Sequence, residues 1–318
     1  MTNNLMRTVE PWTEGDSEGR FAEMMRHLNW LGRRLYSDYE PNAYSTFDEQ
    51  FGKWIENVED EADKKTLFEL LEYLFFVGRR EFEALCRAAF TGPISRWIID
   101  SESIDVAAAD AVSKITAAVK DTWFCPVTDS MRINAFLKLN RIEGKQHRPD
   151  WRSLTEFGDP RKIKAYMDTN ELKRLVLLED FVGSGTQMKN TAEFAASCFD
   201  SLPVLLCPLV CCPGGVETGE KLAARFENFV FEPILRISGH TILRETAGND
   251  EPAVFARVRT LIASEKKRWL KTNREKPYGF EDVGALVVMY SNCPNNTLPI
   301  IHNNSSKWKA LFPRIRRN

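Results

Sequence analysis

Hydrophobic residues are spaced in two different ways along the chain. From about residue 20 to 118, apolar positions recur every three or four residues, as in RFAEMMRHLNWLGRRLY (20–36) and, more densely, in KKTLFELLEYLFFVGRREFEALCRAAF (64–90). This spacing places apolar side chains along one side of a helix and therefore predicts helices. The second stretch is too apolar for a surface helix, so we expect it to be buried or to bind a partner.

From residue 123 onward, short continuous apolar segments alternate with segments of helical spacing. Such alternation is typical of a parallel sheet with helices on both faces. The expected strands are WFCPV (123–127), LVLLED (175–180), PVLLCPLVCC (203–212), NFVFEPIL (228–235) and GALVVMY (284–290). The expected helices between them cover 131–140, 160–172, 186–199, 216–226 and 252–271.

These two patterns divide the chain into two expected domains. A helical region covers 1–118, and its first 20 residues are polar and expected to be loosely held. An α/β domain covers 119–318, with a polar segment near 141–160 that contains Gly and Pro and is interpreted as a hood over the sheet.

Composition narrows the class of protein. The chain has 318 residues, 43% of them hydrophobic, which is enough for a full core and excludes a disordered chain. The net charge of −2 gives no general attraction to nucleic acid, so direct nucleic-acid binding is not expected to dominate. No apolar run reaches the ~18–20 residues that cross a bilayer. Since no secretory signal is visible and the seven cysteines lack metal-ligand spacing, we expect a cytoplasmic protein with reduced thiols.

The segment LVLLEDFVGSGTQ (175–187) carries the clearest candidate chemistry. A buried strand is followed by Glu179 and Asp180 at its carboxyl end, where open parallel sheets bind ligands. Two glycines, Gly183 and Gly185, then allow a sharp turn and a close backbone approach before a helix begins. Free backbone N–H groups at a helix N-terminus bind phosphate. The residues expected to form the phosphate site are Phe181, Val182, Gly183, Ser184, Gly185, Thr186 and Gln187.

This order of features predicts a site for a ribose 5-phosphate. Glu179 and Asp180 would hold the ribose hydroxyls directly or through a divalent cation, and the glycine loop would hold the 5-phosphate. A Walker-type loop fits less well, because the Gly-Lys-Ser/Thr ending is absent. The simpler alternative is an ordinary strand–helix turn beside a chance acidic pair.

The segment resembles the motif by which type I phosphoribosyltransferases bind phosphoribosyl pyrophosphate (PRPP). The resemblance implies that Glu179 and Asp180 contact the ribose 2- and 3-hydroxyls, with Mg²⁺ bridging the pyrophosphate and the ribose. Gly183 stands where purine phosphoribosyltransferases carry an aspartate that acts as general base. The loop also ends in Gly-Thr-Gln, where many members place a threonine two residues after the glycine. Ordinary purine salvage is therefore not expected.

The loop after the first sheet strand contacts pyrophosphate in that family. Asp129, Ser130 and Arg132 occupy this place here and could bind through hydroxyl, amide and guanidinium groups. Alternatively, Asp129 or Ser130 caps the helix that starts near residue 131. Both roles can hold at once.

A closer resemblance is to the phosphoribosyltransferase-like proteins of bacterial conflict systems, called PRTase-CE. It spans roughly residues 65–318. It implies an effector of an anti-phage system, acting on PRPP or a related nucleotide by transfer, cleavage or modification. The resemblance also implies partners such as a retron reverse transcriptase with its noncoding RNA. The segments that carry the resemblance are WFCPVTDSMRINAFLKLN, LVLLEDFVGSGTQ, YSNCPNNTLPIIH and WKALFPR.

A second interpretation of the same fold remains open. The domain could have lost catalysis and sense a nucleotide while residues 20–118 engage a protein partner, an interpretation that Gly183 favours and the intact acidic pair opposes. The Asn-rich segment 291–308, with His302, could read a base, although turn-forming asparagines are the simpler account.

Overall fold

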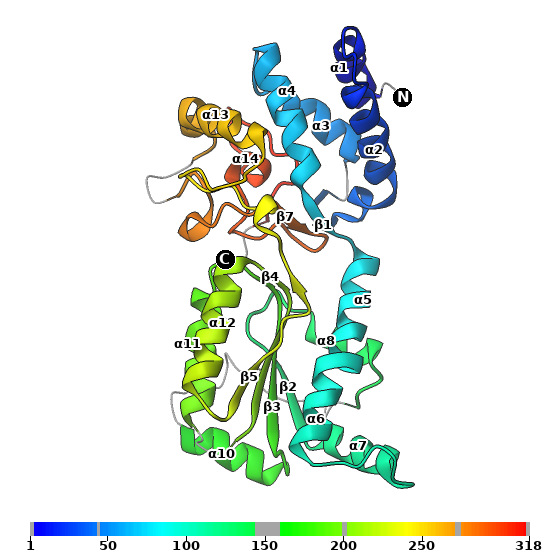
Figure 1. The fold of residues 1–318 in the computed structure, drawn as a ribbon, viewed down its shortest axis with the longest axis vertical. Coiled ribbons are helices and arrows are strands. Elements are labelled where there is room, and N and C mark those ends of the chain that lie inside the picture. The colour runs from blue at the N-terminus through cyan, green and yellow to red at the C-terminus, as the bar shows by residue number, and fades with distance from the viewer. Residues whose placement is uncertain (1–2, 43–44, 144–159, 199–201, 271–274, 316–318) are drawn as a thin grey trace. The chain divides into compact units, whose positions relative to one another are not determined.

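The computed structural model describes residues 3–42, 45–143, 160–198, 202–270 and 275–315 (Figure 1). The chain forms two compact units. We call Arg80–Ile237 the sheet unit, and Met1–Arg79 together with Ser238–Asn318 the helical unit. These boundaries differ from the expected division into 1–118 and 119–318. Most of the expected hood, residues 144–159, lies outside the described residues.

The sheet unit is built on parallel strands in the order β2-β3-β4-β5, and a further short strand, β6, pairs with β4. The predicted parallel α/β architecture is confirmed. The expected strand at 228–235 is split into two short strands. The bounds are β2 Thr122–Pro126, β3 Arg174–Val182, β4 Val204–Cys211, β5 Phe229–Phe231 and β6 Leu235–Arg236.

Helices cover both faces of this sheet (Figure 1). One face packs against α10 (Pro160–Thr169), α11 (Thr186–Cys198) and α12 (Pro213–Arg225). The other face packs against α5 (Arg79–Ala89) and α8 (Ile133–Leu139). The chain between these two elements includes the π-turn η4 (Phe90–Ile94), α6 (Ser95–Ser101) and α7 (Ala111–Lys120).

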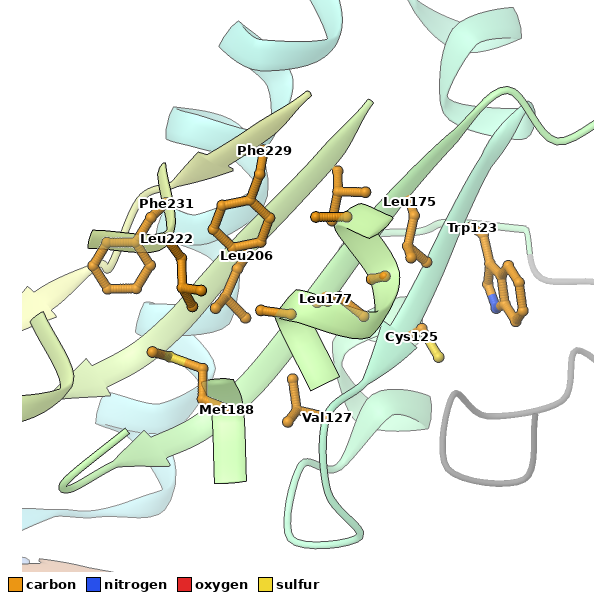
Figure 2. Close-up of a cluster of buried hydrophobic side chains, with 14 of the residues drawn as sticks. Trp123, Cys125, Val127, Leu175, Leu177, Met188, Leu206, Leu222, Phe229 and Phe231 are labelled. Atoms are coloured by element: carbon orange, nitrogen blue, oxygen red, sulfur yellow. The ribbon is translucent and has the colours of Figure 1, made fainter. Parts of the chain in front are cut away.

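Figure 2 shows the core between the sheet and α10–α12. Successive strand residues point to opposite faces, so every second apolar residue of each strand enters this core. The uninterrupted apolar strands predicted burial on both faces, and β4 is buried along its whole length. The members of this core that Figure 2 labels are Trp123, Cys125, Val127, Leu175, Leu177, Met188, Leu206, Leu222, Phe229 and Phe231.

The helical unit combines segments from both ends of the chain. Its short strands β1 (Phe75–Val77) and β7 (Val287–Met289) pair in parallel as a separate two-stranded sheet. The helices are α1 (Asn4–Thr13), α2 (Arg20–Arg34), α3 (Phe47–Ile55), α4 (Glu61–Leu70), α13 (Ala253–Trp269) and α14 (Pro299–His302). The 3-10 turns are η1 (Tyr36–Asp38), η2 (Glu40–Asn42), η3 (Leu71–Tyr73), η5 (Gly239–Thr241) and η6 (Phe280–Asp282).

Three predictions for this unit are wrong. The apolar run 64–90 is not wholly helical, since it contains β1 between α4 and α5. A short apolar run suits a buried strand as well as a helix, and pairing with β7 decides between them. The predicted strand 284–290 does not join the main sheet, because its described strand, β7, pairs with β1 instead. The N-terminal segment is not loosely held where the structure describes it, because α1 buries Leu5, Val9 and Trp12.

Candidate functional site

Glu179 and Asp180 lie near the carboxyl end of β3, the central strand with neighbours on both sides. The strand continues through Val182, so both acids lie within it, and Glu179 is opposite Pro208 of β4. Their exposed fractions are only 4% and 5%. Buried carboxylates are costly unless they are neutralised or hydrogen-bonded, which makes their partners informative.

The loop after β2 supplies hydroxyl and amide donors to these acids. Thr128 donates its backbone N–H to Glu179 Oε2 at 2.9 Å and its hydroxyl to Oε1 at 2.6 Å. Ser130 Oγ lies 3.1 Å from Glu179 Oε1 and 2.7 Å from Asp180 Oδ1, so one hydroxyl bridges the two side chains. Ser130 was predicted at this site from the sequence, and its hydroxyl reaches the acidic pair.

Parallel pairing explains why these distant residues meet. Pro126 of β2 lies opposite Leu178 of β3, and Val127 donates its N–H to the Leu178 carbonyl at 2.8 Å. Both chains therefore leave the ladder at the same edge of the sheet. The loop that follows β2 is carried directly onto Glu179 and Asp180.

The expected helix cap in this loop is not formed by Asp129 or Ser130. Arg132 occupies the N-cap position of α8, and no side-chain cap bond is present there. Asp129 is exposed, whereas Arg132 is half-buried. Asp129, Ser130 and Arg132 were predicted in this loop. Ser130 contacts both members of the acidic pair through its hydroxyl.

Burial changes the acidity of Glu179. Loss of hydration raises its pKa to about 8, and the neighbouring charge of Asp180 acts in the same direction. The hydrogen bonds from Thr128 and Ser130 oppose this rise, because they stabilise the ionised form. These surroundings therefore favour the protonated form of Glu179, and a cation or a further hydrogen-bond donor would favour the ionised form.

The glycine loop, residues 183–185, connects β3 to α11. Gly185 adopts a left-handed φ of 89°. A Cβ at this position would lie 2.8 Å from Thr218 Cβ, so both the backbone angle and the space require glycine. The first turn of α11 begins at once, with Lys189 donating its N–H to the Gly185 carbonyl at 2.7 Å.

The N-terminal half of α12 packs against the glycine loop. Thr218 donates through its hydroxyl, which lies 2.8 Å from the Gly214 carbonyl and 3.2 Å from the Ser184 carbonyl. Gly215 lets the two segments approach, because a Cβ there would meet Val182 at 2.6 Å and Cys211 at 2.9 Å. These contacts were not predicted from the sequence, although the Pro-Gly-Gly that closely follows a buried strand was the available signal.

The seven residues predicted for the phosphate site divide among three elements. Phe181 and Val182 lie in β3, and Val182 packs into the core. The loop 183–185 forms the turn itself. Thr186 and Gln187 are exposed in the first turn of α11. The glycine loop and these two residues are therefore the part of the prediction that is placed to meet a phosphate.

The oxygen atoms around Glu179 and Asp180 suit a metal ion that is coordinated mainly by a bound substrate. Within the described residues, no group of three or more His, Cys, Asp or Glu side chains could form a metal cage. Glu179 and Asp180 offer two carboxylates beside two hydroxyls. Mg²⁺ commonly keeps several waters and binds through one or two carboxylates together with substrate phosphates, which matches this sparse set.

The Asn-rich segment has structural contacts in the helical unit. Asn296 donates to the Phe280 carbonyl at 3.1 Å, and His302 Nε2 lies 3.0 Å from the Thr297 carbonyl. Asn303 is also buried and donates to the Trp269 carbonyl at 3.4 Å. These side chains bind backbone groups, which differs from the exposed turn that their composition suggested.

Comparison with protein families agrees with this geometry. The PRTase-CE family model matches residues 51–314. The chain belongs to the PRTase-CE family. It is thus a phosphoribosyltransferase-like protein, with β3 in a parallel sheet flanked by helices and the glycine loop connecting β3 to α11. No curated protein and no solved structure gives a significant match. In the part of the chain that is described, no helix has both the length and the apolar character needed to cross a membrane.

Proposed function

We propose that this PRTase-CE protein binds PRPP or a related ribose 5-phosphate nucleotide at the carboxyl end of β3. The observation that carries the proposal is the position of the buried Glu179–Asp180 pair, two residues before a glycine loop that leads into the N-terminus of a 13-residue helix. The acids supply acceptors for sugar hydroxyls on one side. The helix N-terminus supplies backbone donors for a phosphate on the other.

The two ends of the ligand would be bound by different means. Ribose hydroxyls donate to the carboxylates, taking up acceptor positions that the hydroxyls of Thr128 and Ser130 now use. The 5-phosphate accepts from the amides at the start of α11, where the helix dipole favours negative charge. Mg²⁺, bound mainly through the ligand's own oxygens, would neutralise the pyrophosphate and keep Glu179 and Asp180 ionised.

We further propose a reaction at the ribose C1 carbon of such a ligand, with Glu179 and Asp180 holding the sugar. Positive charge develops on the ribose ring as its C1 bond breaks, and preorganised negative charge nearby stabilises that state. Gly183 provides no side chain at the position of the purine-enzyme base. The proposed reaction is therefore transfer, cleavage or modification of a nucleotide with another proton acceptor, in a toxin effector of an anti-phage system such as a retron.

The second candidate is a nucleotide sensor without catalysis. Two observations favour it: the glycine at position 183, and the occupation of both Glu179 oxygens by donors from the loop after β2. In this case binding would displace Thr128 and Ser130 and so move that loop. The partner would be another product of the same defence system, such as a reverse transcriptase with its noncoding RNA.

Calorimetric titration with PRPP and Mg²⁺ tests the shared part of both candidates. The wild type is expected to bind only with Mg²⁺ present, and Glu179→Gln/Asp180→Asn to bind at least about 100-fold more weakly. Glu281→Gln/Asp282→Asn is the matched control, since it neutralises another adjacent acidic pair that is not buried. Absence of binding by the wild type, or equal loss in the control, would refute the ligand assignment.

Pyrophosphate release then separates the enzyme from the sensor. The assay covers PRPP with a panel of bases, nucleotides and tRNA, and the enzyme candidate predicts release that Glu179→Gln/Asp180→Asn abolishes. Binding without release supports the sensor. Plaque assays on cells carrying the full defence locus address the biological role, because loss of protection is expected for this variant and not for the control.

A further inference from the structure

One face of α2 in the helical unit has chemistry that the proposed function does not use. The helix is amphipathic, with Met24 and Leu28 buried against the unit. Trp30 points the opposite way and is 59% exposed. At 100° per residue, it lies at the centre of the outward side. We call this side the Trp30 face; its other exposed members are Glu23, Arg26, His27, Arg33 and Arg34.

An exposed tryptophan is unusual in this chain. The ring of Trp30 has no aromatic, cation–π or hydrogen-bond partner among the described residues. Tryptophan offers a large flat surface, and its burial elsewhere contributes strongly to stability. By contrast, the side chains of five other tryptophans are buried: Trp12, Trp54, Trp123, Trp269 and Trp308.

The arginines on this face are also uncompensated. Within the described residues, the side chains of Arg26, Arg33 and Arg34 have no ion pair and no hydrogen bond. Arg20, at the start of the same helix, instead contacts Glu69 at 3.4 Å and Glu72 at 2.9 Å. The outward side therefore keeps a net positive charge, with Glu23 as its one acidic member.

We propose that the Trp30 face binds a single-stranded segment of nucleic acid. Binding of single strands typically combines a stacked base on an aromatic ring with cationic contacts to the phosphates. Arg26 and Arg34 are eight residues apart, or about 12 Å along the helix, which matches about three stacked nucleotides. Trp30 lies between them and offers its ring to a base.

The composition of the face argues for this ligand over two others. A helix that lies on a membrane needs a broad apolar side for the lipid, whereas Trp30 is the only apolar member of this face. An acidic peptide would satisfy the arginines and leave the ring without a base-like partner. The overall charge of −2 also agrees with a small footprint of a few phosphates, not an extended binding surface.

This proposal goes beyond the nucleotide site and does not depend on it. Helix α2 lies outside residues 51–314, which match the family model, and in a different unit from Glu179. A variant of the acidic pair should therefore bind single strands as well as the wild type. Loss of PRPP binding would leave the Trp30 proposal intact, and the reverse also holds.

Fluorescence anisotropy of the full chain with labelled 20-nucleotide oligo-uridine, oligo-thymidine and a duplex of equal length tests the proposal. We expect single strands to be preferred over the duplex. Trp30→Ala should weaken single-strand binding about 5- to 150-fold, the range for loss of one stacked base. Arg26→Gln/Arg33→Gln/Arg34→Gln should make the slope of log K against log salt shallower by about 2, since each phosphate contact on a single strand contributes about −0.7.

Matched controls separate this face from general charge. Lys266→Gln/Lys267→Gln removes two exposed cations from the last turn of α13, as Arg33→Gln/Arg34→Gln does from α2, and should leave binding unchanged. Circular dichroism checks that each variant folds. The proposal is overturned if the wild type binds no single strand at low salt. It is also overturned if Lys266→Gln/Lys267→Gln reduces affinity as much as Arg33→Gln/Arg34→Gln does. It is also overturned if vesicles containing phosphatidylserine bind where single strands do not.

Discussion

Two buried glutamates, one in each unit, have opposite surroundings. Glu69 of α4 is 5% exposed and receives both arms of the Arg257 guanidinium, at 3.3 Å to Oε1 and 2.7 Å to Oε2, with Arg20 at 3.4 Å. Glu179 of β3 is equally buried, yet its oxygens are held by Thr128 and Ser130.

This difference separates a structural acid from an acid available for binding. The charge of Glu69 is compensated within the protein, where it joins α4 to α13. The charge of Glu179 meets hydroxyl and amide donors, and no lysine or arginine among the described residues contributes to its surroundings. A bound cation or sugar can therefore supply Glu179 with compensating charge or hydrogen bonds, which Arg257 and Arg20 already supply to Glu69.

The largest expected effect is that substitution at Glu179 reduces ligand affinity, whereas removal of the arginine that binds Glu69 reduces stability. Glu179→Gln alone should weaken PRPP binding about 30- to 300-fold. At or below about pH 5, where the pH-dependent contribution of Glu179 is largely intact, it should change the free energy of unfolding by less than about 1 kcal/mol, since the surrounding hydroxyls can reorient to accept. Arg257→Met should lower the free energy of unfolding by about 2 kcal/mol, because Glu69 loses charged hydrogen bonds. It should leave PRPP affinity unchanged. Calorimetry and urea unfolding measure the two quantities, and parallel losses in both variants would contradict the distinction.

The second effect concerns the glycine loop that follows Glu179. Gly185→Ala should lower the free energy of unfolding by about 2 kcal/mol, because an alanine at φ 89° is strained and its Cβ meets Thr218. Ligand affinity should fall with it as the loop moves.

Gly239→Ala is the matched control, since a Cβ there meets nothing within 4 Å and its φ is not left-handed. Its free energy of unfolding should stay within about 0.5 kcal/mol of the wild type. Equal stability of the two alanine variants in urea would show that the loop is not constrained as described.

The third effect is a pH dependence contributed by Glu179. Its pKa is about 8 in the folded protein against 4.5 for a free glutamate, so the folded state holds a proton that the unfolded state has released between these values. This contribution to stability is complete below about pH 4.5 and is lost as the pH rises through about 8. The slope is at most about 1.4 kcal/mol per pH unit. Urea unfolding from pH 5 to 8.5 should show a shallower decline for Glu179→Gln than for the wild type. A steeper decline would refute the assignment.

The smallest effect belongs to Ser130, which bridges the two acids. Ser130→Ala removes bonds of 3.1 and 2.7 Å and should cost about 1 kcal/mol in the free energy of unfolding. Ligand affinity should change by less than about fivefold, because ribose hydroxyls can take the vacated acceptors. A loss as large as that of Glu179→Gln would assign Ser130 a direct contact with the ligand.

The sequence predicted the site where its features are consecutive. A buried strand, two acids, a glycine turn and a helix follow each other within 175–187, and the structure contains β3, the loop 183–185 and α11 in this order. Local backbone requirements and apolar spacing were sufficient there. The contacts from Thr128 and Thr218 come from segments 51 and 33 residues away from Glu179 and Gly185, and no local pattern marks them.

The division into units shows the same limit. The apolar pattern at 284–290 predicted a strand, and Val287–Met289 is one. Its partner, β1, was concealed in an apolar run with helical spacing, because short buried strands and helices have similar local composition. The pairing of β1 with β7 depends on contacts between residues more than 200 positions apart.

By itself, the sequence determined the parallel α/β sheet, the acidic pair at a strand end and the glycine loop, since each follows from neighbouring residues. Only the tertiary structure decided that hydroxyls, not arginines, surround Glu179, and that Trp30 has no partner among the described residues. The physical reason is that burial and the identity of a charge's neighbours depend on packing between distant segments. The chain's pattern of apolar residues determines which segments pack and leaves open which polar groups then meet.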